Sequence, residues 1–369
     1  MDSFGVGCLH FSTVNNSNNI EGEEYIENLE NALETVPNIN DIQVSVGDRF
    51  IKESFNIEEN NGTLDGKGSI FPPTSTKLII NYTVYIPRRI QEDLTYNDKH
   101  LDSEKFIVQM RYDPYFFPVT YVEPLSENNI YNPSTGVEIV RKFMDDKFPV
   151  SSICFDSLGP SPFHADFFLS VESSPNGECQ IDGIEYEYSK KGGYDIYSIL
   201  ADKNHFSNLE EAKNKLYYEM KDEFGAFYFM SQGNLRRHKK WRKVSQSSNE
   251  LRSLHGEEGF RGFVNRIVKT NRKLRNCFIL LLDYEAMDIS LRQSAERAYQ
   301  NLLDERTPII DSFLREKKER QWEFPTSQVK EILNLFEGRR RKRIEGVIVI
   351  ISAILGGVVG SIMTMWLSG

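Results

Sequence analysis

Hydrophobic residues recur along the first 205 residues mostly at the spacing of β-strands. Strand-like stretches lie at 42–46, 77–86, 105–112, 115–122, 151–155, 165–171 and 184–188. Only two stretches, 23–36 and 134–148, have helical spacing, and Ser134 is a residue type favoured as an N-cap. Many strands with few helices favour an antiparallel or mixed sheet over a repeated βαβ unit. The sequence therefore predicts an α+β domain over 1–205.

Helical periodicity dominates from Asn208 to the C-terminal third, and it predicts a helical region over 206–337. One apolar stripe comprises Leu209, Ala212, Leu216, Met220 and Phe224. A second stripe comprises Phe260, Val264, Ile267, Leu274, Phe278 and Leu281, and it is interrupted by a polar residue in a way typical of a coiled coil. The simplest arrangement is two long antiparallel helices. A final helix is expected after Pro325, with Gly338 either a joint or part of a continuous helix.

Residues 347–367 form 21 positions without a charge, enough for a helix to cross the roughly 30 Å core of a membrane. A basic segment, 338–346, precedes them, and the positive-inside rule then places the N-terminal side in the cytoplasm. We therefore expect a single-pass membrane protein anchored at its C-terminus, with residues 347–369 as the membrane segment. The alternative is a buried helix in a water-soluble core.

Small residues recur every four positions in this apolar segment and leave one helix face nearly smooth. Close approach across small side chains is a common way for membrane helices to associate. The pattern predicts a homo-oligomer whose helices meet at Ser352, Gly356, Gly357, Gly360, Ser361 and Thr364.

Charge is divided unevenly along the chain. The formal net charge is -10, yet residues 1–230 hold 18 Lys and Arg against 38 Asp and Glu, whereas residues 231–369 hold 26 against 16. This asymmetry points to an anionic partner for the second half. The four cysteines lie far apart, so neither a disulfide framework nor a zinc site is expected.

Two basic segments are the candidate contacts for an anionic partner, and the second contains an aromatic residue. They comprise Arg339, Arg340, Arg341, Lys342 and Arg343, and Arg236, Arg237, Lys239, Lys240, Trp241, Arg242 and Lys243. Basic side chains with an aromatic ring are suited to anionic lipid head groups and also to nucleic acid. Lipid is the expected partner beside a bilayer, nucleic acid is less favoured, and a solvated or acid-paired helix face is the third interpretation.

A loop between two expected strands holds the only candidate catalytic residues. His164 with Asp156 or Asp166 has the chemistry of a general base and its orienting carboxylate. The same loop also suits a hairpin stiffened by proline. Common nucleotide-binding, metalloprotease and esterase motifs are absent from the sequence, and no metal or other cofactor is expected.

These features together favour a membrane-tethered, oligomeric sensor/effector or interaction protein rather than an enzyme. Its acidic domain would bind an unidentified cytoplasmic protein or a small-molecule ligand. The alternatives are a membrane-tethered enzyme that uses the loop containing His164, and an oligomeric channel.

Overall fold

The computed structural model describes the backbone of residues 2–14, 19–51, 54–56, 69–70, 77–95, 101–113, 117–126, 132–149, 151–159, 161–172, 183–191, 193–256, 259–319 and 323–367. For most positions in 255–268 and 347–367 it describes the backbone alone. The chain divides into two compact units, which are treated separately below. Unit 1 comprises residues 1–232 and 295–319, and unit 2 comprises residues 233–294 and 320–369.

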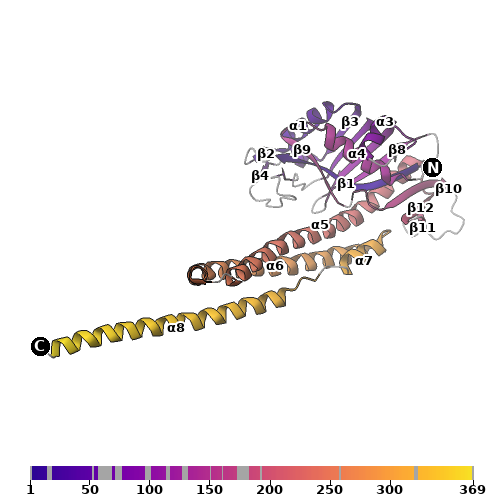
Figure 1. Ribbon diagram of the computed structural model, residues 1–369. Coiled ribbons are helices and arrows are strands. Elements are labelled where there is room, and N and C mark those ends of the chain that lie inside the picture. Colours follow the sequence, from indigo (N-terminus) through magenta and orange to yellow (C-terminus); the bar gives the residue numbers. More distant parts are fainter. Residues whose placement is uncertain are drawn as a thin grey trace. The chain divides into compact units, whose positions relative to one another are not determined.

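Unit 1 is an α+β structure built around a mixed sheet (Figure 1). Its strands are β1 (Asp2–Val14), β3 (Ile39–Val46), β5 (Ser69–Ile70), β6 (Leu78–Tyr85), β7 (Lys105–Tyr112), β8 (Val119–Leu125), β9 (Ile153–Leu158), β10 (Ala165–Glu172), β11 (Ile184–Lys191) and β12 (Tyr194–Asp202). The order is β11-β12-β10-β1-β8-β7-β6-β3, and β5 and β9 also pair with β1. Only the β10–β12 pairing is parallel among the described pairs. A second, two-stranded sheet joins β2 (Asn19–Glu21) to β4 (Ser54–Asn56).

Two hydrophobic cores form in unit 1, and β1 supplies residues to both. Phe4 and Val6 belong to the core packed by α5 (Leu209–Gly256), the end of α6 (Gly259–Glu305) and α7 (Asp311–Glu319). Leu9 and Phe11 belong to the core packed by α1 (Gly22–Glu34) and α4 (Ser134–Lys147). Two shorter helices, α2 (Asp48–Ile51) and α3 (Arg88–Thr95), complete the unit. The core residues of β1 therefore change from even positions to odd positions after Cys8, so the alternation that identifies a strand changes phase within it.

A buried ion cluster attaches the start of α5 to the sheet. Lys213 Nζ lies 2.9 Å from Glu123 Oε2 on β8, 2.7 Å from Glu210 and 3.6 Å from Asp2 on β1. Burial raises the pKa of Glu123, and the ammonium of Lys213 opposes that rise. A carboxylate in this position loses most of its hydration, so the ionised form of Glu123 is stabilised mainly by Lys213.

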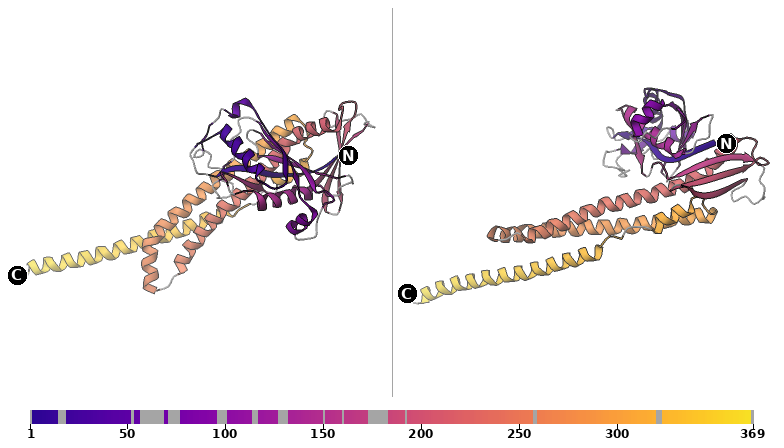
Figure 2. Two further views of the ribbon diagram at one scale, coloured as in Figure 1. Left: turned by 90° about the horizontal axis from the view of Figure 1, so that it is seen from above. Right: turned by 45° about the vertical axis from the view of Figure 1, so that its right-hand side comes forward.

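Unit 2 packs three helix segments around a small core. They are the second half of α5, the first part of α6 and the start of α8 (Thr326–Leu367), which the views of Figure 2 follow from two directions. The core includes Val244, Leu251, Leu281 and Leu333. Residues 250 and 273 form an ion pair, as do residues 237 and 288, so α5 and α6 run antiparallel in this unit. Gly338 lies inside the continuous helix α8.

The membrane prediction is wrong, because no helix in the described part of the chain is long and apolar enough to cross a membrane. The apolar run 347–367 is the end of α8, a 42-residue helix that also carries the basic segment Arg339 to Arg343 and exposed polar residues before it. The expected single-pass anchor and membrane localisation are corrected accordingly. The cytoplasmic location was inferred from the orientation of that anchor and is therefore withdrawn. The predictions of a membrane-tethered sensor, a membrane-tethered enzyme and a channel are withdrawn for the same reason.

The coiled-coil prediction is also corrected. Within the expected stripe on α6, Leu274 and Leu281 are buried, but Phe278 between them is 49% exposed. A continuous seam requires every member of the stripe to face the partner helix. Phe260, Val264 and Ile267 lie outside the residues whose side chains are described. The predicted boundaries at 205, 337 and 346 stay predictions.

Replacing Lys213 by Met should lower the free energy of unfolding by about 3 kcal/mol at pH 7, because Glu123 is left buried without its cation. A raised pKa in the folded state means that protonation of Glu123 favours folding, so the loss should shrink as the pH falls through that pKa. Urea unfolding from pH 4 to pH 8 measures both effects. Lys215→Met is the control, since its ion pair with Glu219 is more exposed, and its expected change is within about 0.5 kcal/mol. An equal loss in both variants would contradict the role of Lys213.

Candidate anion-binding groove

The basic segment of α5 places its side chains on different sides of one helix. Arg237 points into unit 2 and is only 2% exposed, whereas His238, Lys239 and Arg242 are exposed. Arg236 is half-buried, and burial lowers the pKa of its guanidinium. A run of adjacent charges in the sequence is therefore divided between a structural ion pair and an outer surface.

Arg237 supports this part of α5 from the inside. It pairs with Asp288 on α6, whose other oxygen accepts a hydrogen bond of 2.9 Å from Arg292 Nε. The Tyr284 hydroxyl lies 3.4 Å from Asp288, and burial, with Asp288 next in effect, raises the pKa of Tyr284 to about 12. Tyr284 thus stays protonated at neutral pH. Because Arg237 lies on α5 and Asp288 on α6, their ion pair fixes the two helices against each other at this level.

An aromatic cluster continues this support toward the surface. The ring of Trp241 packs against Phe324 at 5.1 Å and meets Tyr284 edge-on at 5.3 Å between centroids. His238 also contacts Phe324, at 5.0 Å with the rings nearly perpendicular. The guanidinium of Arg237 lies over the Phe324 ring, 5.7 Å from its centroid. Trp241 is consequently held in one position while part of its ring remains accessible.

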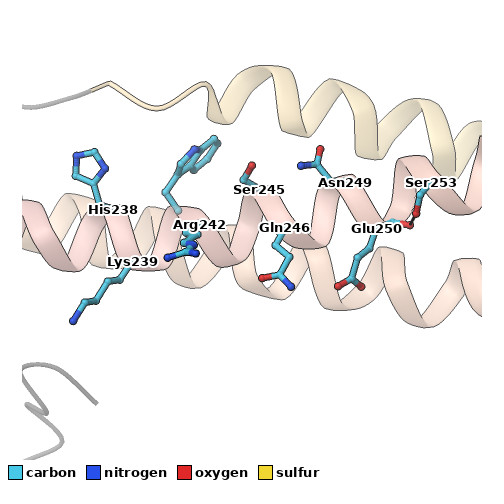
Figure 3. A pocket seen from close by; sticks show the side chains of 9 residues that line it. His238, Lys239, Arg242, Ser245, Gln246, Asn249, Glu250 and Ser253 are labelled. Atoms are coloured by element: carbon cyan, nitrogen blue, oxygen red, sulfur yellow. Dashed lines mark hydrogen bonds between the residues drawn. The ribbon is translucent and has the colours of Figure 1, made fainter. Parts of the chain in front are cut away.

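An open groove of about 1020 Å³ runs along this face of α5 (Figure 3). Its described lining comprises His238, Lys239, Trp241, Arg242, Ser245, Gln246, Asn249, Glu250 and Ser253. In Figure 3, the side chains of His238, Ser245 and Asn249 point toward the pale yellow segment that includes the start of α8, and those of Lys239, Gln246 and Glu250 point away from it. The two rows are the two borders of one broad face of α5.

The groove brings together only part of the expected anion-contact set. Lys239, Trp241 and Arg242 line it, Arg237 is interior, and Lys240 and Lys243 are outside the described lining. In the second basic segment Arg339, Arg341 and Lys342 are exposed, and Arg341 pairs with Glu337 at 2.8 Å. The side chains of Arg340 and Arg343 are outside the described residues. Of the expected helix-association residues, Ser352 is exposed, and Gly356, Gly357, Gly360, Ser361 and Thr364 lie in the segment described by its backbone alone.

The three residues of the candidate catalytic loop have different surroundings. Asp156 lies within β9 opposite His10 of β1, and its Oδ1 accepts the Ser157 N–H at 2.8 Å. His164 is exposed, whereas Asp166 on β10 is 1% exposed. Asp166 Oδ1 accepts the N–H of Ser134 at 2.9 Å. Asp166 therefore caps the first turn of α4, at the position where Ser134 itself was expected to be the N-cap.

Sequence reasoning missed the polar half of the groove. Ser245, Gln246, Asn249 and Ser253 follow the basic segment at three- and four-residue steps, which places them on the same helix face. This spacing is the sequence pattern from which the polar half of the groove could have been predicted. Among the described residues, no group of three or more His, Cys, Asp or Glu side chains is placed to hold a metal ion.

Comparisons with known proteins identify no relative: no family model, curated protein or solved structure matches the chain.

The cap formed by Asp166 predicts a pH dependence. Burial raises the pKa of this carboxyl, and its bonds to Ser134 only partly oppose the rise. Its contribution to stability is therefore complete below the unfolded pKa of about 3.9 and is lost as the pH rises through the higher folded value. Asp166→Asn keeps an acceptor and removes the ionisation, so its unfolding midpoint should rise relative to that of the unmodified chain between pH 4 and pH 7.

Asp166→Ala is the companion variant, because it removes the acceptor as well. It should be destabilised by about 1 kcal/mol throughout this pH range, since the first turn of α4 loses its cap. Urea unfolding monitored by circular dichroism gives both comparisons. A constant difference between the unmodified chain and Asp166→Asn at every pH would refute the assignment.

Proposed function

We propose that this protein is a binding protein whose helical unit 2 takes a phosphate-bearing ligand in the α5 groove. The observation that carries the proposal is the position of His238, Lys239 and Arg242, exposed together beside a fixed aromatic ring. Guanidinium and ammonium groups bind phosphate oxygens through charge-assisted hydrogen bonds. The aromatic surface adds contact area for the part of the ligand that carries no charge.

The charge of unit 2 supports the same proposal. Its residues include 21 Lys and Arg against 10 Asp and Glu, a net charge of +11, whereas the remaining residues of the chain sum to -21. Such a field attracts anions and raises their rate of association. The groove is open, and eight of its nine described lining residues carry polar or charged side chains that can bind a polar ligand.

Binding of tripolyphosphate to the full-length chain tests the proposal, with titration calorimetry at about 50 and 200 mM salt as the measurement. The double variant Lys239→Gln/Arg242→Gln should weaken binding about 30-fold, because two charge-assisted contacts are lost. Arg272→Gln is the matched control, since Arg272 is an exposed cation on α6 outside the described lining. The control should change affinity less than about threefold.

Equal weakening by the control would show that diffuse charge, and not the groove, binds the anion, and would contradict the proposal. Vesicles that contain phosphatidylserine form a second arm of the experiment. Groove-dependent binding of tripolyphosphate in solution supports a free phosphate compound as the ligand source. Binding to vesicles without any binding of tripolyphosphate would instead assign the basic residues to a lipid head group and overturn the proposal of a groove for a free ligand.

A further inference from the structure

The groove has two chemically different ends. Its first end carries the cationic and aromatic residues, from position 238 to position 242. Its second end carries hydroxyl and carboxamide groups from Ser245, Gln246, Asn249 and Ser253. These neutral groups both donate and accept hydrogen bonds. A ligand that fills the whole groove therefore needs negative charge at one end and uncharged polar groups at the other.

Glu250 sharpens this division. It lines the neutral end, is exposed, and forms an ion pair with Lys273, whose Nζ lies 3.2 Å from its carboxylate. The two charges of this pair balance, so the second end offers no excess positive charge to a phosphate, whereas the first end does. The phosphates of a bound ligand are thereby confined to the end near Lys239 and Arg242. A uniform polyphosphate chain along the whole groove is disfavoured.

The length of the groove limits the size of the neutral part. Positions 238 and 253 are separated by 15 residues, which correspond to about 22 Å along a helix at 1.5 Å per residue. The phosphate end occupies about the first turn of this length, and the remaining turns present amide and hydroxyl groups. Nucleobases and ribose carry several donors and acceptors that Asn, Gln and Ser side chains recognise.

Resting on the function proposed above, we propose that the ligand is a nucleotide. Its phosphates bind at His238, Lys239 and Arg242, and its base and sugar bind along Gln246, Asn249 and Ser253. The fixed ring of Trp241 belongs to the first end and contacts the part of the ligand next to the phosphates. Recognition of the base by Gln246 and Asn249 makes the site select nucleotides over inorganic polyphosphate.

The test compares ATP, tripolyphosphate and adenosine as probes, titrated calorimetrically into the full-length chain. ATP should bind at least about tenfold more tightly than tripolyphosphate, because the base and sugar add hydrogen bonds. The double variant Gln246→Ala/Asn249→Ala should weaken ATP about tenfold and leave tripolyphosphate unchanged. Asn271→Ala is the matched control, an exposed amide on α6 outside the described lining, and it should change neither affinity.

The outcomes separate this inference from the function on which it rests. Tripolyphosphate binding that equals ATP binding, with no effect of the amide variants, overturns the nucleotide assignment and leaves the phosphate groove standing. Failure of both probes to bind overturns the proposed function itself. An eight-nucleotide single-stranded DNA that binds more than tenfold tighter than ATP overturns the nucleotide assignment in favour of a nucleic-acid strand. Circular dichroism of each variant shows whether its helices remain folded.

Discussion

The attachment of one helix, α5, to the sheet is the constraint on which the other features of this chain depend. α5 is 48 residues long, and its first half belongs to unit 1 and its second half to unit 2. In unit 1 its apolar stripe covers the sheet core, and Lys213 joins it to Glu123. Removing the lysine would leave a buried carboxylate without a counter-ion. The resulting loss of folding free energy is larger than the contribution of an exposed ion pair.

A second buried carboxylate is also paired with a cation, at the point where the chain returns to unit 1. Glu223 on α5 is 1% exposed, lies 2.6 Å from Arg306 just after α6, and accepts the N–H of Ile310 at 3.1 Å. Burial raises its pKa, and Arg306 together with the backbone N–H groups opposes the rise. One acidic side chain thus satisfies both a cation and the backbone that precedes α7. Helix α5 is tied to its surroundings by charge as well as by apolar packing.

Local patterns predicted elements whose environment is uniform along their length. The stretch 105–112 was expected as a strand and is β7, with Phe106, Val108 and Met110 buried in one core. β1 was missed because it contributes to two cores in turn: its apolar residues change from even to odd positions after Cys8, and the alternation is broken within the strand. The cap of α4 was assigned to Ser134 from its residue type. The actual acceptor, Asp166, lies 32 positions later, and no local rule reaches that far.

The groove also shows where prediction from local sequence patterns ends, in this case for a functional site. A count of the charges in 236–243 treats all of them as one surface, although Arg237 is buried and forms an ion pair with Asp288 inside unit 2. Helical periodicity would have separated these positions and joined the outer ones to Ser245 and Asn249. The C-terminal prediction failed because apolar content was considered apart from the long helix α8 that contains it, where the described residues provide no membrane-spanning segment.

Segregation of charge gives the groove an advantage that its lining alone does not. Unit 1 carries a net charge of -21 and unit 2 a net charge of +11, so the first repels an anionic ligand and the second attracts it. Long-range fields of this kind act on the rate of encounter and on the exclusion of wrong sites more than on the strength of the final contacts. The final contacts come instead from a few side chains at short range, and these can distinguish one anion from another. Under the proposed function, the acidic excess of unit 1 disfavours the binding of anions elsewhere on the chain, and the neutral end of the groove selects among the anions that reach α5.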